Sequence, residues 1–188
     1  MNKIVWVFGE SASGKETFIR YAVDNPDCEL MQQLGFSNSK LIPIEESMHK
    51  GEAKIGSSSS YDRIKIKDVV LDLSQTEDNA VFLIKWQAVD SIHIKYGDAL
   101  RKLALQTPDT LKQIILLSVE SNTLYSRLPS KYWWKDVNYS QEKMNESVTK
   151  MRSHIVDLLE LGFTVVEINA TNGYELLENN TLKTEKKK

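Results

Sequence analysis

The sequence has one cysteine, four prolines and no excess of charge of either sign. The lone Cys28 can form neither an intramolecular disulfide nor a zinc site of the usual cysteine type. The 24 basic and 26 acidic side chains give a formal net charge of −2, so the whole molecule is not attracted to nucleic acid or to an anionic membrane. These absences argue against a disulfide scaffold, a zinc module and a nucleic-acid-binding protein.

No apolar run approaches the ~20 residues that a membrane span needs. Residues Met1 to Lys3 lead directly into an apolar stretch and lack signal-peptide anatomy. We therefore expect a cytoplasmic protein with no membrane contact. The length of 188 residues fits one domain, predicted over 1–180 with a polar tail over 181–188. The Gly- and Ser-rich stretch 47–60 is predicted to be mobile.

Short apolar runs alternate with helical patterns along the chain. Strands are predicted over 4–8, 40–44, 80–86, 113–119 and 163–168. Helices are predicted over 15–25, 27–34, 96–104, 122–128 and 144–158, with a short terminal helix near Glu175. Residues 62–74 fit both a helix and a strand, and the helix is favoured. The pattern predicts an α/β fold with a parallel five-stranded sheet and helices on both faces.

A phosphate-binding loop is predicted between the first strand and the first helix, where the chain reads Gly9-Glu10-Ser11-Ala12-Ser13-Gly14-Lys15-Glu16-Thr17. Glycines allow the backbone to bend closely around phosphates, successive N–H groups point inward, and a lysine reaches the outer phosphates. Gly9, Gly14 and Lys15 have the spacing of this loop (P-loop, or Walker A). An apolar strand before it and an amphipathic helix after it are its expected context.

The loop departs from the usual pattern at one position. Glu16 follows Lys15, where a Ser or Thr normally binds Mg²⁺. Thr17 comes one place later, and we assign the magnesium-ligand role to its hydroxyl. Glu16 is interpreted either as a water-mediated magnesium contact or as a solvated acid in the first helical turn, where the helix dipole favours it.

On these residues the chain resembles the nucleoside-monophosphate-kinase-like branch of the P-loop NTPases. The resemblance is specific at residues 3–24 and architectural elsewhere. It implies a three-layer nucleotide-kinase-like fold that uses ATP and Mg²⁺. Two alternatives remain open, an ATPase or nucleotide-sensing module without a metabolite acceptor, and a protein that keeps the loop but has lost turnover. The GTPase motif Asn-Lys-x-Asp is absent, which argues against a GTPase.

The resemblance also implies a lid and a base-binding loop. The segment 121–136 is lid-like, with Arg127, Lys131 and Lys135 as cations for the transferred phosphate. The alternative is a solvated basic helix. The loop after the last strand, which contains Thr171, is expected beside the nucleotide base, although Asn172-Gly173 is equally an ordinary turn signal.

A catalytic or magnesium-linked acid is harder to assign. Glu45 and Glu46 follow the second strand and are candidates to accept the proton of the acceptor, with Glu45 preferred. Asp72, Asp90 and Glu45 are the candidates for the magnesium-linked acid, and a surface or capping role is the alternative for each. His49, His93 and His154 show no metal spacing.

The sequence therefore predicts an ATP-dependent phosphotransferase that acts on a small acceptor such as a nucleoside or nucleotide. The acceptor is expected between the segment 45–60 and the basic segment 127–135. The expected partners are ATP and this acceptor, and a homodimer is compatible with the sequence.

Overall fold

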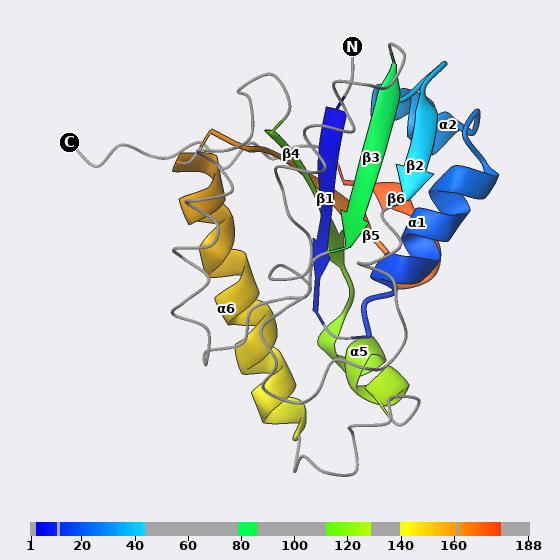
Figure 1. The fold of residues 1–188 in the computed structure, drawn as a ribbon. Coiled ribbons are helices and arrows are strands. Elements are labelled where there is room, and N and C mark those ends of the chain that lie inside the picture. The colour runs from blue at the N-terminus through cyan, green and yellow to red at the C-terminus, as the bar shows by residue number, and fades with distance from the viewer. Residues whose placement is uncertain are drawn as a thin grey trace.

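The computed structural model describes residues 3–10, 12–43, 79–85, 112–128, 140–160 and 162–177. These residues form one sheet covered by helices on both faces (Figure 1). Helix α6 (Gln141–Glu160) covers one face, and α1 (Lys15–Asp24) and α2 (Glu29–Gln33) cover the other. The predicted α/β class is therefore confirmed.

Strand β1 (Lys3–Gly9) lies in the middle of the sheet. Its residues Ile4 to Val7 are at most 1% exposed, as expected of an apolar run covered on both faces. It pairs in parallel with β3 (Ala80–Lys85) on one side and β4 (Lys112–Ser118) on the other. The segment after β1 thus emerges between the carboxyl ends of two neighbouring strands.

The sheet has the order β2-β3-β1-β4-β5-β6. Strands β2 (Lys40–Pro43) and β5 (Thr164–Asn169) extend the parallel part outward. From β1 the chain passes through α1 towards the β2 side, whereas from β4 it passes through α6 towards the β5 side. The two directions diverge between β1 and β4, and ligands of open α/β sheets bind beyond the carboxyl ends of the strands at such a switch point.

The prediction of a purely parallel five-stranded sheet is wrong at one edge. A sixth strand, β6 (Glu175–Leu176), pairs antiparallel with β5, so the sheet is mixed. The helix predicted near Glu175 is therefore also wrong. The chain reverses after β5 through Gly173, whose φ of 141° suits glycine, and Leu177 N–H then donates to Glu167 O at 3.0 Å.

Helix α1 packs against the sheet and forms part of the hydrophobic core. Its buried side chains Phe18, Ile19 and Ala22 pack in one cluster with Val5 and Val7 of β1. The first turn of α1 is thereby fixed directly above the carboxyl end of β1. Helix α5 (Ser121–Arg127) follows β4 at the same edge of the sheet.

Several predicted segments lie outside the described residues. They are the ambiguous segment 62–74, the helix over 96–104, the stretch 47–60, the second half of the lid-like segment and the tail over 181–188. Among the helices that the structure describes, none has the length and apolar character needed to cross a membrane.

Candidate phosphate-binding site

The loop between β1 and α1 has the backbone of a tight phosphate-binding turn. Ser13 N–H donates to Glu10 O at 3.1 Å, and Ala12 adopts a positive φ of 67°. Gly14 follows in the left-handed region, at φ 86°, and is the N-cap of α1. The loop therefore closes on itself and passes directly into the N-terminus of a helix, where backbone N–H groups and the helix dipole favour an anion.

Gly9 has no room for a side chain. A Cβ built there would lie 2.4 Å from Ser13 Oγ and 3.0 Å from Leu117 O, and its φ of 153° is one that L side chains rarely adopt. The first glycine of the predicted spacing is thus required by both sterics and backbone conformation.

Lys15 lies inside the loop rather than in solvent. The residue is 7% exposed, and its Nζ donates to Gly9 O and Glu10 O, both at 2.8 Å. A buried ammonium placed among backbone dipoles is a strong electrostatic group. The loop therefore carries a fixed positive charge within its own ring.

Two cavities lie beside this loop, and the first has a volume of about 420 Å³. Ala12 to Gly14 and Thr17 line this cavity, together with Arg127 and the segment Ala170 to Tyr174. The predicted residues Thr17, Arg127 and Thr171 therefore meet at one cavity, although they are distant in the sequence. We call it the loop cavity.

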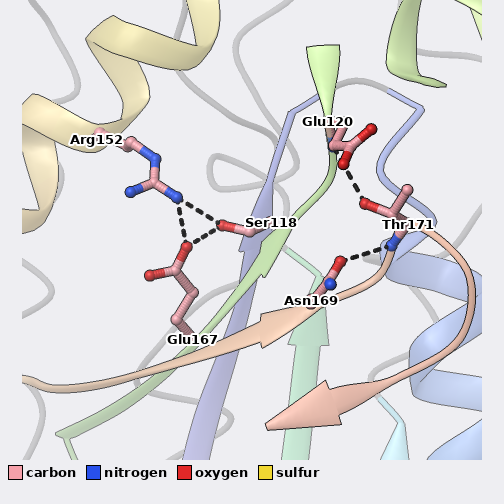
Figure 2. Close-up of polar contacts among 6 residues, drawn as sticks. All are labelled: Ser118, Glu120, Arg152, Glu167, Asn169 and Thr171. Carbon is pink, nitrogen blue, oxygen red and sulfur yellow. Dashed lines mark hydrogen bonds and ion pairs between the residues drawn. The ribbon is translucent and has the colours of Figure 1, made fainter. Parts of the chain in front are cut away.

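The segment Ala170 to Tyr174 is held to β4 and α5 by hydrogen bonds. Ala170 N–H donates to Ser118 O at 2.8 Å, and Glu120 N–H donates to Thr171 Oγ1 at 3.2 Å. Arg127 Nη2 donates to Thr171 O at 2.9 Å and to Ala170 O at 3.4 Å. Figure 2 shows Thr171 between Glu120 and Asn169, whose Oδ1 accepts from Thr171 N–H at 3.1 Å. Arg127 therefore fixes one wall of the loop cavity.

Tyr174 completes this wall. Its ring packs edge-on against Phe18 at a centroid distance of 5.1 Å and in a tilted orientation against Tyr21 at 4.9 Å. Burial raises the pKa of the Tyr174 phenol above its usual value, the charge of Arg127 opposes this, and Tyr21 adds to it. The aromatic contacts tie the wall to α1.

The second cavity has a volume of about 450 Å³ and lies towards α6. It shares Thr171 with the loop cavity and is otherwise lined by polar and apolar residues at the carboxyl ends of β1, β4 and β5, together with residues of α5 and α6. Glu10, Glu120 and Arg152 are its charged lining residues among those the structure describes. We call it the α6 cavity.

A cluster of polar side chains lies at the α6 cavity (Figure 2). Arg152 Nη2 lies 2.6 Å from Glu167 Oε1 and 3.3 Å from Ser118 Oγ, and Ser118 Oγ donates to the same carboxylate oxygen. Ser118, Glu120 and Arg152 were not predicted as site residues from the sequence. The signal available for Ser118 and Glu120 was their position at the carboxyl end of β4.

Glu16 is engaged by two cations. Its Oε1 accepts from Arg20 Nη2 at 2.8 Å, and its Oε2 lies 3.8 Å from Lys85 Nζ. Lys85 is the last residue of β3 and was not identified from the sequence. Thr17 lines the loop cavity and is the hydroxyl to which the magnesium role was assigned. In the part of the chain that the structure describes, no group of three or more His, Cys, Asp or Glu side chains forms a metal site.

The resemblance implies two ligands, ATP and Mg²⁺, and the residues of this region fit them differently. Ser13 Oγ is buried and has no hydrogen-bond partner among the described residues, and the loop N–H groups and Lys15 are suited to phosphate oxygens. ATP therefore fits the loop. A magnesium ion held by the residue after Lys15 does not fit, because the Glu16 carboxylate is already paired with Arg20 and Lys85.

Several predicted residues lie outside the described part of the chain. They are Ser11 of the loop, the acids Glu45, Glu46, Asp72 and Asp90, and the lid cations Lys131 and Lys135. The predicted acceptor position between 45–60 and 127–135 falls almost wholly in the same undescribed segments.

No protein-family model matches the chain, and no curated protein matches it. Matches are found among solved structures. One of them is the crystal structure of shikimate kinase from Bacteroides thetaiotaomicron, with 15% sequence identity, a TM-score of 0.43, and coverage of 89% of this chain and 86% of that chain. At this TM-score the likeness carries no argument about the substrate of this chain.

Proposed function

We propose that this protein binds ATP through the loop Gly9–Thr17 and transfers its terminal phosphoryl group to a small acceptor. One observation carries the proposal. The glycine-bent loop encloses the Lys15 ammonium and opens, at the N-terminus of α1, into the loop cavity. Fixed backbone dipoles and a buried cation are what a polyphosphate requires.

The phosphates lie along the loop in this proposal. Backbone N–H groups of Ala12, Gly14 and Lys15 bind phosphate oxygens, the Lys15 ammonium contacts the outer phosphates, and the buried Ser13 Oγ gains a partner. The base and ribose then occupy the loop cavity beside Thr171. The support is that Thr171 lines this cavity and is held in place by hydrogen bonds from Arg127 and Glu120.

The catalytic roles follow from the same arrangement. Lys15 stabilises charge on the transferred group, and Arg127 adds a second cation at the loop cavity. Glu45 remains the proposed group for the proton of the acceptor, on the sequence argument alone. Because Arg127 also holds the segment Ala170–Tyr174, its removal should affect nucleotide binding as well as transfer.

The α6 cavity is a second place for the acceptor, next to the nucleotide. Among its described lining residues, Glu10 and Glu120 are acidic, and the one cation, Arg152, is already paired with Glu167. A lining without excess positive charge favours an uncharged hydroxyl-bearing acceptor over a phosphorylated one. Within the predicted acceptor class, this supports a nucleoside rather than a nucleotide.

The test is ATP binding and turnover in Lys15→Ala beside the parent protein, with Lys40→Ala as the control. Lys40 is exposed at the start of β2, away from the loop. Lys15→Ala should weaken binding of a fluorescent ATP analogue by more than about tenfold, because a charge-assisted contact to phosphate is lost. Equal affinity in Lys15→Ala and the parent would contradict the proposal.

A second measurement separates transfer from binding alone. ADP release is followed with nucleosides, nucleotides and sugars as acceptors. Release that depends on one acceptor supports the kinase. Acceptor-independent release, or binding without release, supports an ATPase or a nucleotide-sensing module instead.

A further inference from the structure

A phosphate-binding loop normally binds its metal ion beside the loop lysine. In P-loop enzymes, Mg²⁺ is held by the Ser or Thr after the loop lysine together with an aspartate at a neighbouring strand. In this chain the residue after the lysine is Glu16. Its partner from the neighbouring strand β3 is Lys85, at a distance of 3.8 Å between Glu16 Oε2 and Lys85 Nζ.

The position of Lys85 is fixed by the sheet. Strand β3 is the parallel neighbour of β1, and Lys85 stands opposite Val7, two residues before Gly9. The side chain two positions earlier, Leu83, packs in the same core cluster as Val5, Val7 and Phe18. Since alternate side chains of a strand share a face, Lys85 lies on the α1 face, beneath the first turn of that helix. Only 13% of its side chain is exposed.

The pair therefore reverses the usual charge pattern. A hydroxyl residue with an aspartate carries one negative charge, which a divalent cation neutralises. Glu16 with Lys85 is neutral, and Arg20 at 2.8 Å gives the cluster a net positive charge. A magnesium ion brought to this cluster meets a partly buried ammonium, whose repulsion is weakly screened.

We propose that the cations of this cluster, and not a magnesium ion held by the Thr17 hydroxyl as the sequence suggested, offset the charge of the ATP phosphates, so that the protein binds ATP without needing Mg²⁺. Lys85 ends β3, the strand beside β1, whose carboxyl end leads into the loop, and in this proposal its ammonium group and that of Lys15 offset the phosphate charge. The proposal rests on the proposed function and concerns binding of the nucleotide. It also explains why a glutamate is tolerated beside the loop lysine, because Arg20 and Lys85 hold its carboxylate away from the phosphates.

The experiment compares the affinity for a fluorescent ATP analogue in excess Mg²⁺ and in excess EDTA. We expect the two dissociation constants of the parent protein to agree within about threefold, which is less than 1 kcal/mol. The double variant Glu16→Ser/Lys85→Asp restores the usual pair. It should bind more than about tenfold more weakly in EDTA than in Mg²⁺.

Lys40→Ala is the matched control, because it removes an exposed lysine at the start of β2, away from the loop, and leaves the Glu16 cluster intact. The ratio of the control variant's dissociation constants in EDTA and in Mg²⁺ should equal the ratio of the parent protein. If the double variant does not fold, the single variant Lys85→Met serves, and its affinity in EDTA should fall while the helix content is kept.

The outcomes separate this inference from the proposed function. Binding by the parent in Mg²⁺ but not in EDTA would overturn the inference and leave ATP binding intact. Absence of binding under both conditions would overturn both. Equal affinities in the parent, with magnesium dependence gained in the double variant, would support the proposal.

Discussion

Gly9 and Gly14 are both loop glycines with positive φ, but their surroundings differ. A Cβ at Gly9 would collide with Ser13 Oγ and Leu117 O, whereas a Cβ at Gly14 would meet nothing within 4 Å. The conformational cost of a side chain applies to both positions, and the steric cost applies to Gly9 alone.

We therefore predict that Gly9→Ala is the more damaging of the two substitutions. Gly14→Ala should lower the free energy of unfolding by about 1–2 kcal/mol, the cost of a left-handed alanine. Gly9→Ala should lower it by about 3 kcal/mol or more, since overpacking adds to a strained backbone. Urea unfolding followed by circular dichroism measures both. Equal losses would show that the loop relaxes around a methyl group at position 9.

At the residue scale, the sequence could predict what local spacing encodes. Gly9, Gly14 and Lys15 are close in the chain, and their chemistry requires no tertiary information. The partners of Glu16 could be predicted only in part. Arg20 lies one helical turn away, but Lys85 reaches Glu16 because β3 lies beside β1, which single-sequence patterns do not reveal.

Among the structural elements, the turn after β5 depends most on a few hydrogen bonds. Thr171 accepts from Glu120 N–H through its hydroxyl, and its carbonyl accepts from Arg127. The turn contains no helix or strand of its own between Ala170 and Tyr174. These contacts from β4 and α5 therefore decide how well the wall of the loop cavity is ordered.

We predict that Thr171→Val weakens ATP binding by about fivefold, because the loss of one net hydrogen bond is worth about 1 kcal/mol. Ser126→Ala is the control, since Ser126 Oγ donates to Thr123 O within α5 and Ser126 is not among the residues that line the loop cavity. Titration with the fluorescent ATP analogue measures both variants. An unchanged affinity in Thr171→Val would mean that the turn does not touch the nucleotide.

The elements that were predicted correctly from the sequence are those with a continuous apolar run or a clear helical periodicity. The apolar runs of β1, β3 and β4 are covered on both faces, and the helical pattern of α1 is strong. Strand β6 was missed because it has two residues and exists only through its pairing with Ile168 and Asn169 of β5. Its sequence is compatible with a helix, and the tertiary partner decides the outcome.

For the whole molecule, the stability should depend on pH through Tyr174. Its pKa is raised above the usual value of 10.0, chiefly by burial, so the folded state holds the phenol proton more tightly than the unfolded state does. This contribution to stability is complete below about pH 10 and is lost as the pH rises further, because the unfolded chain ionises first.

We predict that Tyr174→Phe loses less stability than the parent protein when the pH is raised through about 10. Phenylalanine keeps the ring contacts with Phe18 and Tyr21 but cannot ionise. Urea unfolding at a series of alkaline pH values gives the two curves, and their difference isolates Tyr174 from the lysines. Parallel curves would contradict the assignment.

The central place of β1 has a consequence for how the chain reaches its native state. Both hydrogen-bonded neighbours of β1 lie far from it along the chain, at Ala80–Lys85 and Lys112–Ser118. During synthesis the first strand and its loop therefore emerge long before either neighbour exists. Pairings of such large sequence separation form slowly, since the entropy of closing the intervening chain is lost before the contacts are gained. The segment that carries the phosphate-binding residues is thus the first to be made and among the last to be completed. Until β4 has been synthesised, the apolar strand β1 is a target for chaperones and for aggregation.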